Sequence, residues 1–210
     1  MRSIILIGAG GHCVSCINAI ESTGEWQIAG LVDLQERIGA RLLGYEVIGN
    51  DDELTELSAH FEAALITVGQ ILSSSIRRRL FLAARVSGFE LPTIIASTAQ
   101  ISRHVNLGCG TIVLHHGFVN AGAQVGENCI LNTGAIIEHN VTIGNHCHIS
   151  TGAIVNGNCI VGDDSFIGSG AVLINGIHLV QGCIVGAGAV VTEDLHEAGI
   201  YIGRPARRME

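Results

Sequence analysis

The chain has 210 residues, enough for one large domain or two modest ones, and carries a formal net charge of -8 with a sequence pI near 5.6. This charge argues against nucleic acid or an anionic membrane as a partner, because neither would be attracted at long range. All 11 cationic residues are arginines, so any phosphate clamp must be built from guanidinium or backbone N–H groups.

No secretory signal peptide is recognisable, so the cytoplasm is the expected compartment. Residues 165–192 carry no formal charge, but Asn175, His178 and Gln181 interrupt the run, which we interpret as folded core and not as a membrane span. The 7 cysteines require neither disulfides nor a zinc site, and neither is expected. Four of them fall on a recurring small position where a thiol packs as a small hydrophobe: Cys129, Cys147, Cys159 and Cys183.

The first hundred residues alternate between strand-like apolar runs and helical spacing. Residues 3–8 lead into a glycine turn, after which Val14, Ile17 and Ile20 recur at helical spacing. Further strands are predicted at 26–33, 61–69 and 91–95, with a helix that residues 73–75 could cap after the run at 61–69. This alternation predicts a small parallel sheet covered on both faces, so residues 1–98 are predicted to form an α/β, Rossmann-like domain.

The glycine turn at residues 8–13 begins like the dinucleotide fingerprint G-x-G-x-x-G but has Cys13 at the third glycine position, so a complete NAD site is not expected. Glycine backbone beside a helix N-terminus still suits a phosphate or diphosphate, and Asp33 could accept hydrogen bonds from ribose or base. Two plainer alternatives stay open: a tight turn without a ligand, and His12 as an ordinary residue of the first helical turn. The arginines at 77–79 are interpreted as a solvated helix face.

Residues 101–191 have Ile, Leu or Val at every sixth position. This period matches neither a helix nor a heptad, but it suits a parallel β-coil in which one residue per side points inward. Four residues after most anchors stands a small residue that lets a corner close over the core. Three hexads make one triangular coil of about 18 residues, and stacking at strand spacing gives about five coils. Residues 99–210 are therefore predicted to form a parallel β-helix with a C-terminal tail.

The residue before each inward anchor is expected to point outward, and the three resulting columns differ in polarity. The first column is apolar: Phe118, Ile136, Ile154, Val172 and Val190. The third is apolar except for one histidine: Ile112, Ile130, His148, Phe166 and Ile184. The second suits water: Asn106, Gln124, Thr142, Ile160 and His178. Two apolar outer faces would be an association liability on a monomer, and packing first against third face around a ring predicts a homotrimer.

Two histidines border the predicted cleft between subunits. His148 is the polar member of an apolar column, and His139 stands at the end of the other apolar face. An imidazole, with an ordinary pKa of about 6.5, can act as a general base near neutrality. The alternative is that both histidines only fill interface gaps. Five others are interpreted as turn or surface residues: His104, His115, His116, His146 and His178.

Several motifs together resemble a known group of enzymes. They are the Gly-Ala-Gly-Gly-His turn, the hexads, Ile137-Glu138-His139-Asn140, the His148–Ala153 stretch and the closing Ile-Gly-Arg-Pro-Ala at 202–206. The chain resembles the left-handed β-helix acyltransferases that acetylate sugars, and within them the nucleotide-sugar N-acetyltransferases and the sialic acid O-acetyltransferases. The left hand of the helix is implied by this resemblance alone.

The resemblance also implies roles for individual residues. His139 would be the general base, with Asn140 where several relatives have a carboxylate, and His148 would lie against the thioester of acetyl-CoA. The nucleotide-sugar would be held by Gly10, Gly11, His12 and Asp33, with Gly69 nearby. The remaining acetyl-CoA contacts would be backbone at Ser169 and Ala187, along the pantetheine, and Arg204 and Arg207 at the phosphates.

The resulting hypothesis is direct acetyl transfer from acetyl-CoA, without a metal, to an amine of a nucleotide-activated sugar such as a 4-amino-4,6-dideoxy hexose. An O-acetyltransferase acting on sialic acid is the nearest alternative, because an alcohol also needs a base. A metal-dependent lyase of the γ-carbonic anhydrase type is more remote, since the two-coil histidine spacing of its zinc site is missing. A binding or scaffold module is disfavoured by the separate ligand domain.

Overall fold

The computed structural model describes residues 2–209, which separate into two compact units. The first unit contains the chain up to Gly69 together with Ser75–Ser97, and the second contains Gln70–Ser74 and the chain from Thr98 onward. The short segment Gln70–Ser74 therefore belongs to the second unit although its sequence neighbours on both sides belong to the first.

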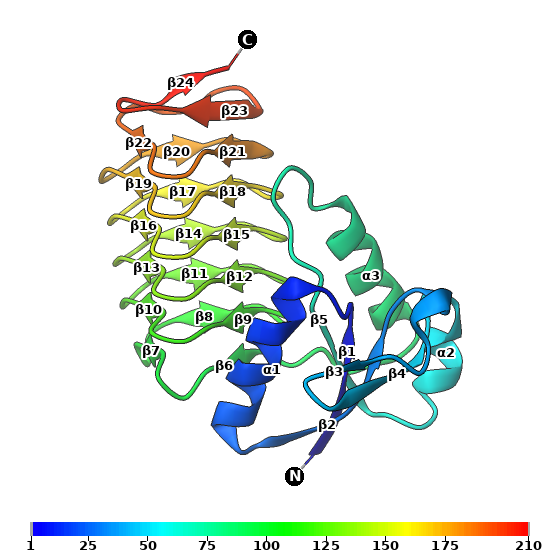
Figure 1. The fold of residues 1–210 in the computed structure, drawn as a ribbon. Coiled ribbons are helices and arrows are strands. Elements are labelled where there is room, and N and C mark those ends of the chain that lie inside the picture. Colours follow the sequence, from blue (N-terminus) through cyan, green and yellow to red (C-terminus); the bar gives the residue numbers. More distant parts are fainter. Residues whose placement is uncertain (1, 210) are drawn as a thin grey trace. The chain divides into compact units, whose positions relative to one another are not determined.

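The first unit is built on a sheet with strand order β3-β4-β2-β1-β5 (Figure 1). Its strands are β1 (Arg2–Ile7), β2 (Trp26–Val32), β3 (Arg41–Leu42), β4 (Tyr45–Gly49) and β5 (Ala63–Ile66); β6 (Ile94–Ile95) follows later in this unit. All neighbours are parallel except β3 and β4. The parallel α/β unit predicted from the alternating pattern is confirmed. The hairpin of β3 and β4 was not predicted, because its short strands lack a long apolar run.

Helices cover the sheet on both faces, since Ile4, Ile5, Leu6 and Ile7 of β1 are all 0% exposed. The helical elements are α1 (Gly11–Thr23), α2 (Leu54–Leu57), α3 (Ser75–Val86) and the 3-10 turns η1 (Gln35–Arg37) and η2 (Asp51–Glu53). Residues of α2 and α3 pack with Ile5 and Ile7 in one apolar cluster. None of the helices formed by residues 2–209 has the length and apolar character needed to cross a membrane.

The interpretation of residues 77–79 as a solvated face is wrong for Arg77, which is 1% exposed. Its Nη1 donates to the carbonyl oxygens of Ile66 and Val68, at 2.6 and 2.9 Å. A guanidinium can be buried when its N–H groups find such acceptors. Arg77 therefore caps the carboxyl end of β5, while Arg78 and Arg79 remain exposed as expected.

The second unit winds into stacked triangular coils whose sides form three parallel sheets, drawn from green to red in Figure 1. The first sheet contains β7 (Gln100–Ile101), β10 (Phe118–Val119), β13 (Ile136–Ile137), β16 (Ile154–Val155), β19 (Val172–Leu173) and β22 (Val190–Val191). The second contains β8 (Asn106–Leu107), β11 (Gln124–Val125), β14 (Thr142–Ile143), β17 (Ile160–Val161) and β20 (His178–Leu179). The third contains β9 (Ile112–Val113), β12 (Ile130–Leu131), β15 (His148–Ile149), β18 (Phe166–Ile167) and β21 (Cys183–Val185). The tail adds β23 (Gly199–Ile202), parallel to β21, and β24 (Arg207–Arg208), which is antiparallel to β23.

Each coil pairs with the next in the predicted register of 18 residues, as in Val119 beside Ile137 and Ile137 beside Val155. The anchors from Val113 to Val191 are at most 5% exposed and form one continuous core. The corner thiols Cys129, Cys147, Cys159 and Cys183 are all 0% exposed and reduced, which confirms their predicted packing role.

The prediction that the third column is an exposed apolar face is wrong. Ile112 and Ile130 are 0% exposed, and His148 and Phe166 are 6% and 8% exposed, within the single chain. At His148 the cover is the segment Gln70–Ser74, which lies on this side of the coil. The first column is only partly covered, and the second is exposed as predicted. The first column is therefore the apolar face still open to a partner.

Candidate active site

The glycine turn follows β1 at the carboxyl edge of the first unit's sheet. Gly8 has φ +107, and a Cβ there would lie 2.4 Å from Cγ2 of Val68, so no other residue fits. The Gly8 carbonyl accepts a hydrogen bond from Oγ1 of Thr67 at 2.6 Å. Gly10 and Gly11 are exposed, and a Cβ on either would meet nothing within 4 Å. The turn thus leaves open backbone at the first turn of α1, where N–H groups favour an anion.

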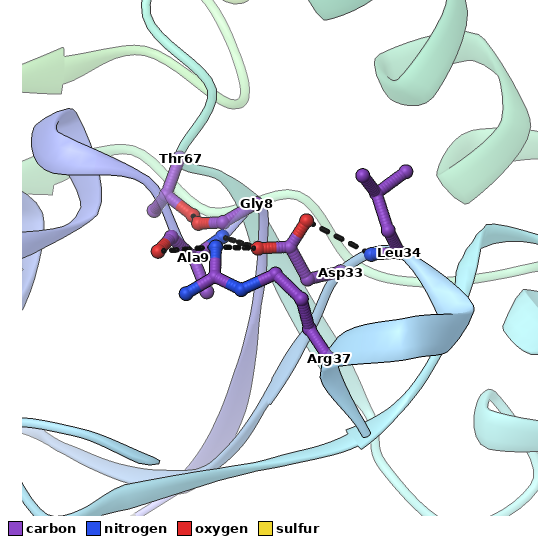
Figure 2. Close-up of polar contacts among 6 residues, drawn as sticks. All are labelled: Gly8, Ala9, Asp33, Leu34, Arg37 and Thr67. Atoms are coloured by element: carbon purple, nitrogen blue, oxygen red, sulfur yellow. Dashed lines mark hydrogen bonds and ion pairs between the residues drawn. The ribbon is translucent and has the colours of Figure 1, made fainter. Parts of the chain in front are cut away.

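Asp33 lies directly after β2 and holds this turn in place (Figure 2). Its Oδ2 accepts from the backbone N–H of Ala9 at 3.0 Å and from Nη1 of Arg37 at 2.6 Å, and its Oδ1 accepts from the N–H of Leu34 at 2.9 Å. Nη1 of Arg37 also donates to the Ala9 carbonyl at 3.1 Å. Asp33 therefore shapes the loop through Arg37 and Ala9, a partnership that its place in the sequence did not suggest.

A hollow with about 400 Å³ of empty space opens beside Asp33. Asn50, which follows β4, also lines it, together with Asp51 and Arg79. Nη2 of Arg79 and Oδ2 of Asp51 form an ion pair at 3.0 Å. Because the hollow lies past the carboxyl ends of β2 and β4, it occupies the edge where open α/β sheets bind ligands.

His12 and Gly69 are brought together as neighbours. A Cβ on Gly69 would lie 3.3 Å from the Cβ of His12, so the missing side chain lets the histidine pack closely. Both residues stand at the same sheet edge, one at the start of α1 and the other after β5. The predicted nucleotide residues thus gather at one edge of the first unit.

His139 stands in the exposed turn after β13 of the second unit. Its Nδ1 meets the amide Nδ2 of Asn140 at 3.3 Å, and that amide also donates to Oδ1 of Asn158 at 3.4 Å. With the amide nitrogen toward the ring, Nδ1 accepts and the neutral ring carries its proton on Nε2. A half-turn of the amide presents Oδ1 instead, so that Nδ1 donates and Nε2 has the lone pair that a general base needs.

His148 lies on β15 with both ring nitrogens engaged. Nδ1 donates to the carbonyl oxygen of Gln70 at 2.7 Å, and Nε2 accepts from Nδ2 of Asn132 at 3.0 Å. Phe166 meets the ring edge-on, with centroids 5.2 Å apart. A ring that donates from one nitrogen and accepts at the other is neutral, so His148 is held as a fixed neutral imidazole and is not a proton acceptor here.

Hydrogen bonds tie the segment Gln70–Ser74 to the coil. Besides the bond to His148, Nε2 of Gln70 donates to the carbonyl oxygen of His146 at 2.7 Å, and Oγ of Ser74 donates to Oδ1 of Asp164 at 2.6 Å. His146, expected at a turn or surface, does lie in a turn with φ +57 but is 9% exposed. Asn132 and Gln70 were not foreseen as site residues. No periodic pattern connects Gln70 with the coil, and the register that places Asn132 on the neighbouring coil does not show that its side chain reaches His148.

The residues expected to meet acetyl-CoA lie along the third sheet and the tail. Ser169 and Ala187 are exposed one coil apart, after β18 and β21, and Oγ of Ser169 is 3.0 Å from Oγ of Ser150. Nε of Arg204 donates to the Gly188 carbonyl at 2.6 Å, while Nη1 of Arg207 pairs with Glu193 at 2.9 Å. Both arginines are exposed, but Arg207 is already committed to a carboxylate.

Within residues 2–209 no group of three or more His, Cys, Asp or Glu side chains is arranged to hold a metal ion. The buried thiols stay protonated, since burial raises the pKa of Cys13 and of Cys183 to about 11. The pKa of Cys147 is also raised, because its thiol is hydrogen-bonded to Cys129 and buried. Burial thus keeps these three thiols protonated near neutral pH.

Comparison with known families assigns both units. The PglD N-terminal domain family matches residues 3–83, the bacterial transferase hexapeptide family (six repeats) matches 122–157, and the hexapeptide repeat of succinyl-transferase matches 158–193. PerB from Caulobacter crescentus, solved with CoA and GDP-perosamine, is 32% identical, with a TM-score of 0.93 over 100% of this chain and 98% of PerB. The chain belongs to the left-handed β-helix sugar acetyltransferases.

Two further proteins of known structure have the same architecture. The acetyltransferase domain of PglB from Neisseria gonorrhoeae FA1090 is 31% identical, covers 100% of each chain and gives a TM-score of 0.91. WeeI from Acinetobacter baumannii AYE, at 23% identity and a TM-score of 0.88 over 100% of each chain, shows the shared fold. The search of curated proteins gave no match. The predicted left-handed β-helix and the acetyltransferase class are thereby confirmed for this chain.

Proposed function

We propose that this acetyltransferase moves the acetyl group of acetyl-CoA to the amine of a nucleotide-activated amino sugar. The observation that carries the proposal is full-length similarity to PerB, whose structure holds CoA and GDP-perosamine. The open glycine turn and the hollow beside Asp33 supply, in the first unit, the features that a nucleoside diphosphate needs. Gly10, Gly11 and His12 would meet the diphosphate, and the base would enter the hollow.

The proposed chemistry is a direct transfer in a ternary complex. The neutral amine attacks the thioester carbonyl carbon while Nε2 of His139 takes the proton that the nitrogen sheds. The tetrahedral intermediate collapses, the C–S bond breaks, and the CoA thiolate leaves and is protonated by the imidazolium. The product is an amide and free CoA thiol, and His139 returns to its neutral form. Asn140 would hold the productive ring tautomer with Oδ1, in place of a carboxylate.

The ring of His148 would form a fixed surface of the site, against which acetyl-CoA lies. This ring is immobilised by Gln70 and Asn132, which suits a group that positions a thioester. Backbone at Ser169 and Ala187 would line the pantetheine track. Arg204 would reach the CoA phosphates, and Arg207 would do so only by releasing Glu193.

We further propose that the protein is a homotrimer with the site in the seam between protomers. The support is the partly covered apolar column of the first sheet, which contains Phe118, Ile136, Ile154, Val172 and Val190. Light scattering should give three times the chain mass, and a monomer at micromolar concentration would contradict this assembly.

Thermal shift with UDP-, GDP- and dTDP-sugars, alone and with acetyl-CoA, tests the substrate class. A true ligand at 100 times its Kd adds about 2.7 kcal/mol of stability, so it raises the Tm measurably. A protein stabilised by none of the nucleotides at millimolar concentration would not have the proposed substrate.

A further inference from the structure

Gly157 occupies the same corner position as His139, one coil later in the stack. The backbone N–H of the next residue, Asn158, donates to the His139 carbonyl at 3.1 Å, which fixes this alignment. A Cβ on Gly157 would lie 2.6 Å from both Cε1 and Nε2 of His139 and 3.2 Å from Cδ2. The imidazole therefore rests against the glycine Cα, in space that any side chain at 157 would fill.

The backbone at this corner does not itself need glycine. Gly157 is not among the glycines with a positive φ, and the equivalent positions in the other coils carry Arg103, Ala121, His139 and Asn175. A side chain is thus sterically allowed at this register wherever no imidazole lies against it. The missing side chain at 157 therefore serves the ring and not the coil.

The contact decides where the ring points. With the imidazole against Gly157, Nδ1 lies at the Asn140 amide and Nε2 lies at the level of the next coil. Without this seat, an exposed histidine has several staggered rotamers available. Because a displacement of about 1 Å in a reacting group can cost about 100-fold in rate, this seat matters for proton transfer.

We propose that Gly157 is a positioning residue of the transfer reaction, which seats the His139 imidazole so that Nε2 faces the amine. The proposal rests on the proposed role of His139 as general base. Normal van der Waals separation is about 3.5 Å, so a methyl group at 157 displaces Cε1 and Nε2 by about 1 Å or turns the ring into another rotamer. The fold has no reason to change, because the ring is exposed and free to move.

The experiment compares Gly157→Ala, His139→Ala and the double variant in the full-length enzyme. Gly157→Ala should lower kcat about 10- to 100-fold, with KM for both substrates within about twofold and Tm within about 2 °C of the parent. In the His139→Ala background, which is the matched control, adding Gly157→Ala should leave kcat unchanged, since no ring remains to displace. Imidazole NMR signals of His139 should shift in the single variant.

The outcomes separate this proposal from the one it rests on. Full kcat in Gly157→Ala beside an inactive His139→Ala would overturn the seat and leave the base assignment intact. Equal fold-losses from Gly157→Ala in both backgrounds would also overturn it, because the effect would not act through the ring. Full activity in His139→Ala would overturn the base assignment itself, and the seat with it as a catalytic feature.

Discussion

Replacing His139 by alanine should separate catalysis from stability more cleanly than any other change in this chain. The side chain is exposed, and its one described polar contact is the 3.3 Å approach to Asn140, at the long end for a hydrogen bond. Exposed substitutions of this kind change the free energy of unfolding by about 0.5 kcal/mol or less. For a chain of this length that is a Tm change of about 2 °C.

The effect on rate should be far larger. General-base catalysis contributes about 10²- to 10⁴-fold, which corresponds to about 2.7 to 5.4 kcal/mol of transition-state stabilisation. We therefore expect kcat for amine acetylation to fall by two to four orders of magnitude, while acetyl-CoA binding, measured by calorimetry, stays within about twofold. The assay follows CoA thiol release at saturating nucleotide-sugar.

A matched control is His178→Ala, since His178 is also exposed and lies on the second, polar sheet. It should keep both kcat and Tm. The reasoning is refuted if His139→Ala retains more than about a tenth of the parent kcat, or if its loss of rate comes with a loss of Tm much beyond about 2 °C.

Three further changes test the surroundings of the site. Asn140→Asp should raise kcat by up to about tenfold, because a carboxylate holds the productive tautomer of His139 and stabilises its imidazolium form. A lower kcat in steady-state kinetics would count against this prediction. His148→Ala removes a buried ring and leaves the Gln70 carbonyl without its donor, so it should lower the free energy of unfolding, measured in urea, by about 3 to 5 kcal/mol. A loss below about 1 kcal/mol would speak against a stabilising role for the hydrogen bond between His148 and Gln70. Burial raises the pKa of Cys13 to about 11 from 9.0, so the stabilisation from its buried neutral thiol is complete below pH 9 and falls by about 3 kcal/mol as the pH rises to 11. In urea titrations Cys13→Ala should make this decline less steep, and an unchanged decline would argue against the assignment.

The coil and its core were predictable because the place of a residue within its hexad already determines whether it points inward or stands at a corner. Anchors such as Val119, Ile137 and Val155 each meet their neighbours 18 residues away in a fixed register. Corner residues such as Cys147 could likewise be placed from spacing alone. The glycine turn was predictable for the same reason, since Gly8 and its neighbours form one short, continuous motif.

Contacts between distant segments could not be predicted. Gln70 meets His146 and His148 across 76 and 78 residues, and no periodicity connects the two regions. This segment covers His148 in the third column, so the outward-pointing residues of the coil could not all be assumed to be exposed. Arg77 looked like part of a charged helix face because its acceptors, the carbonyl oxygens of Ile66 and Val68, have no signature in the sequence.

The contact between His139 and Gly157 could be predicted in part. The register of 18 residues places Gly157 beside His139, so their proximity could be computed once the coil was accepted. The direction of the ring could not, because an exposed imidazole is free to adopt several rotamers until its neighbours are known.

The central claim, acetyl transfer to the amine of a nucleotide-activated sugar, is tested most directly by mass spectrometry of products from a panel of 4-amino sugar nucleotides with acetyl-CoA. The account predicts that at least one nucleotide-sugar gains a single acetyl group that resists hydroxylamine, as an amide does. Acetylation that hydroxylamine removes would identify an ester and an alcohol substrate, and the absence of any acetylated amino sugar across the panel would contradict the account.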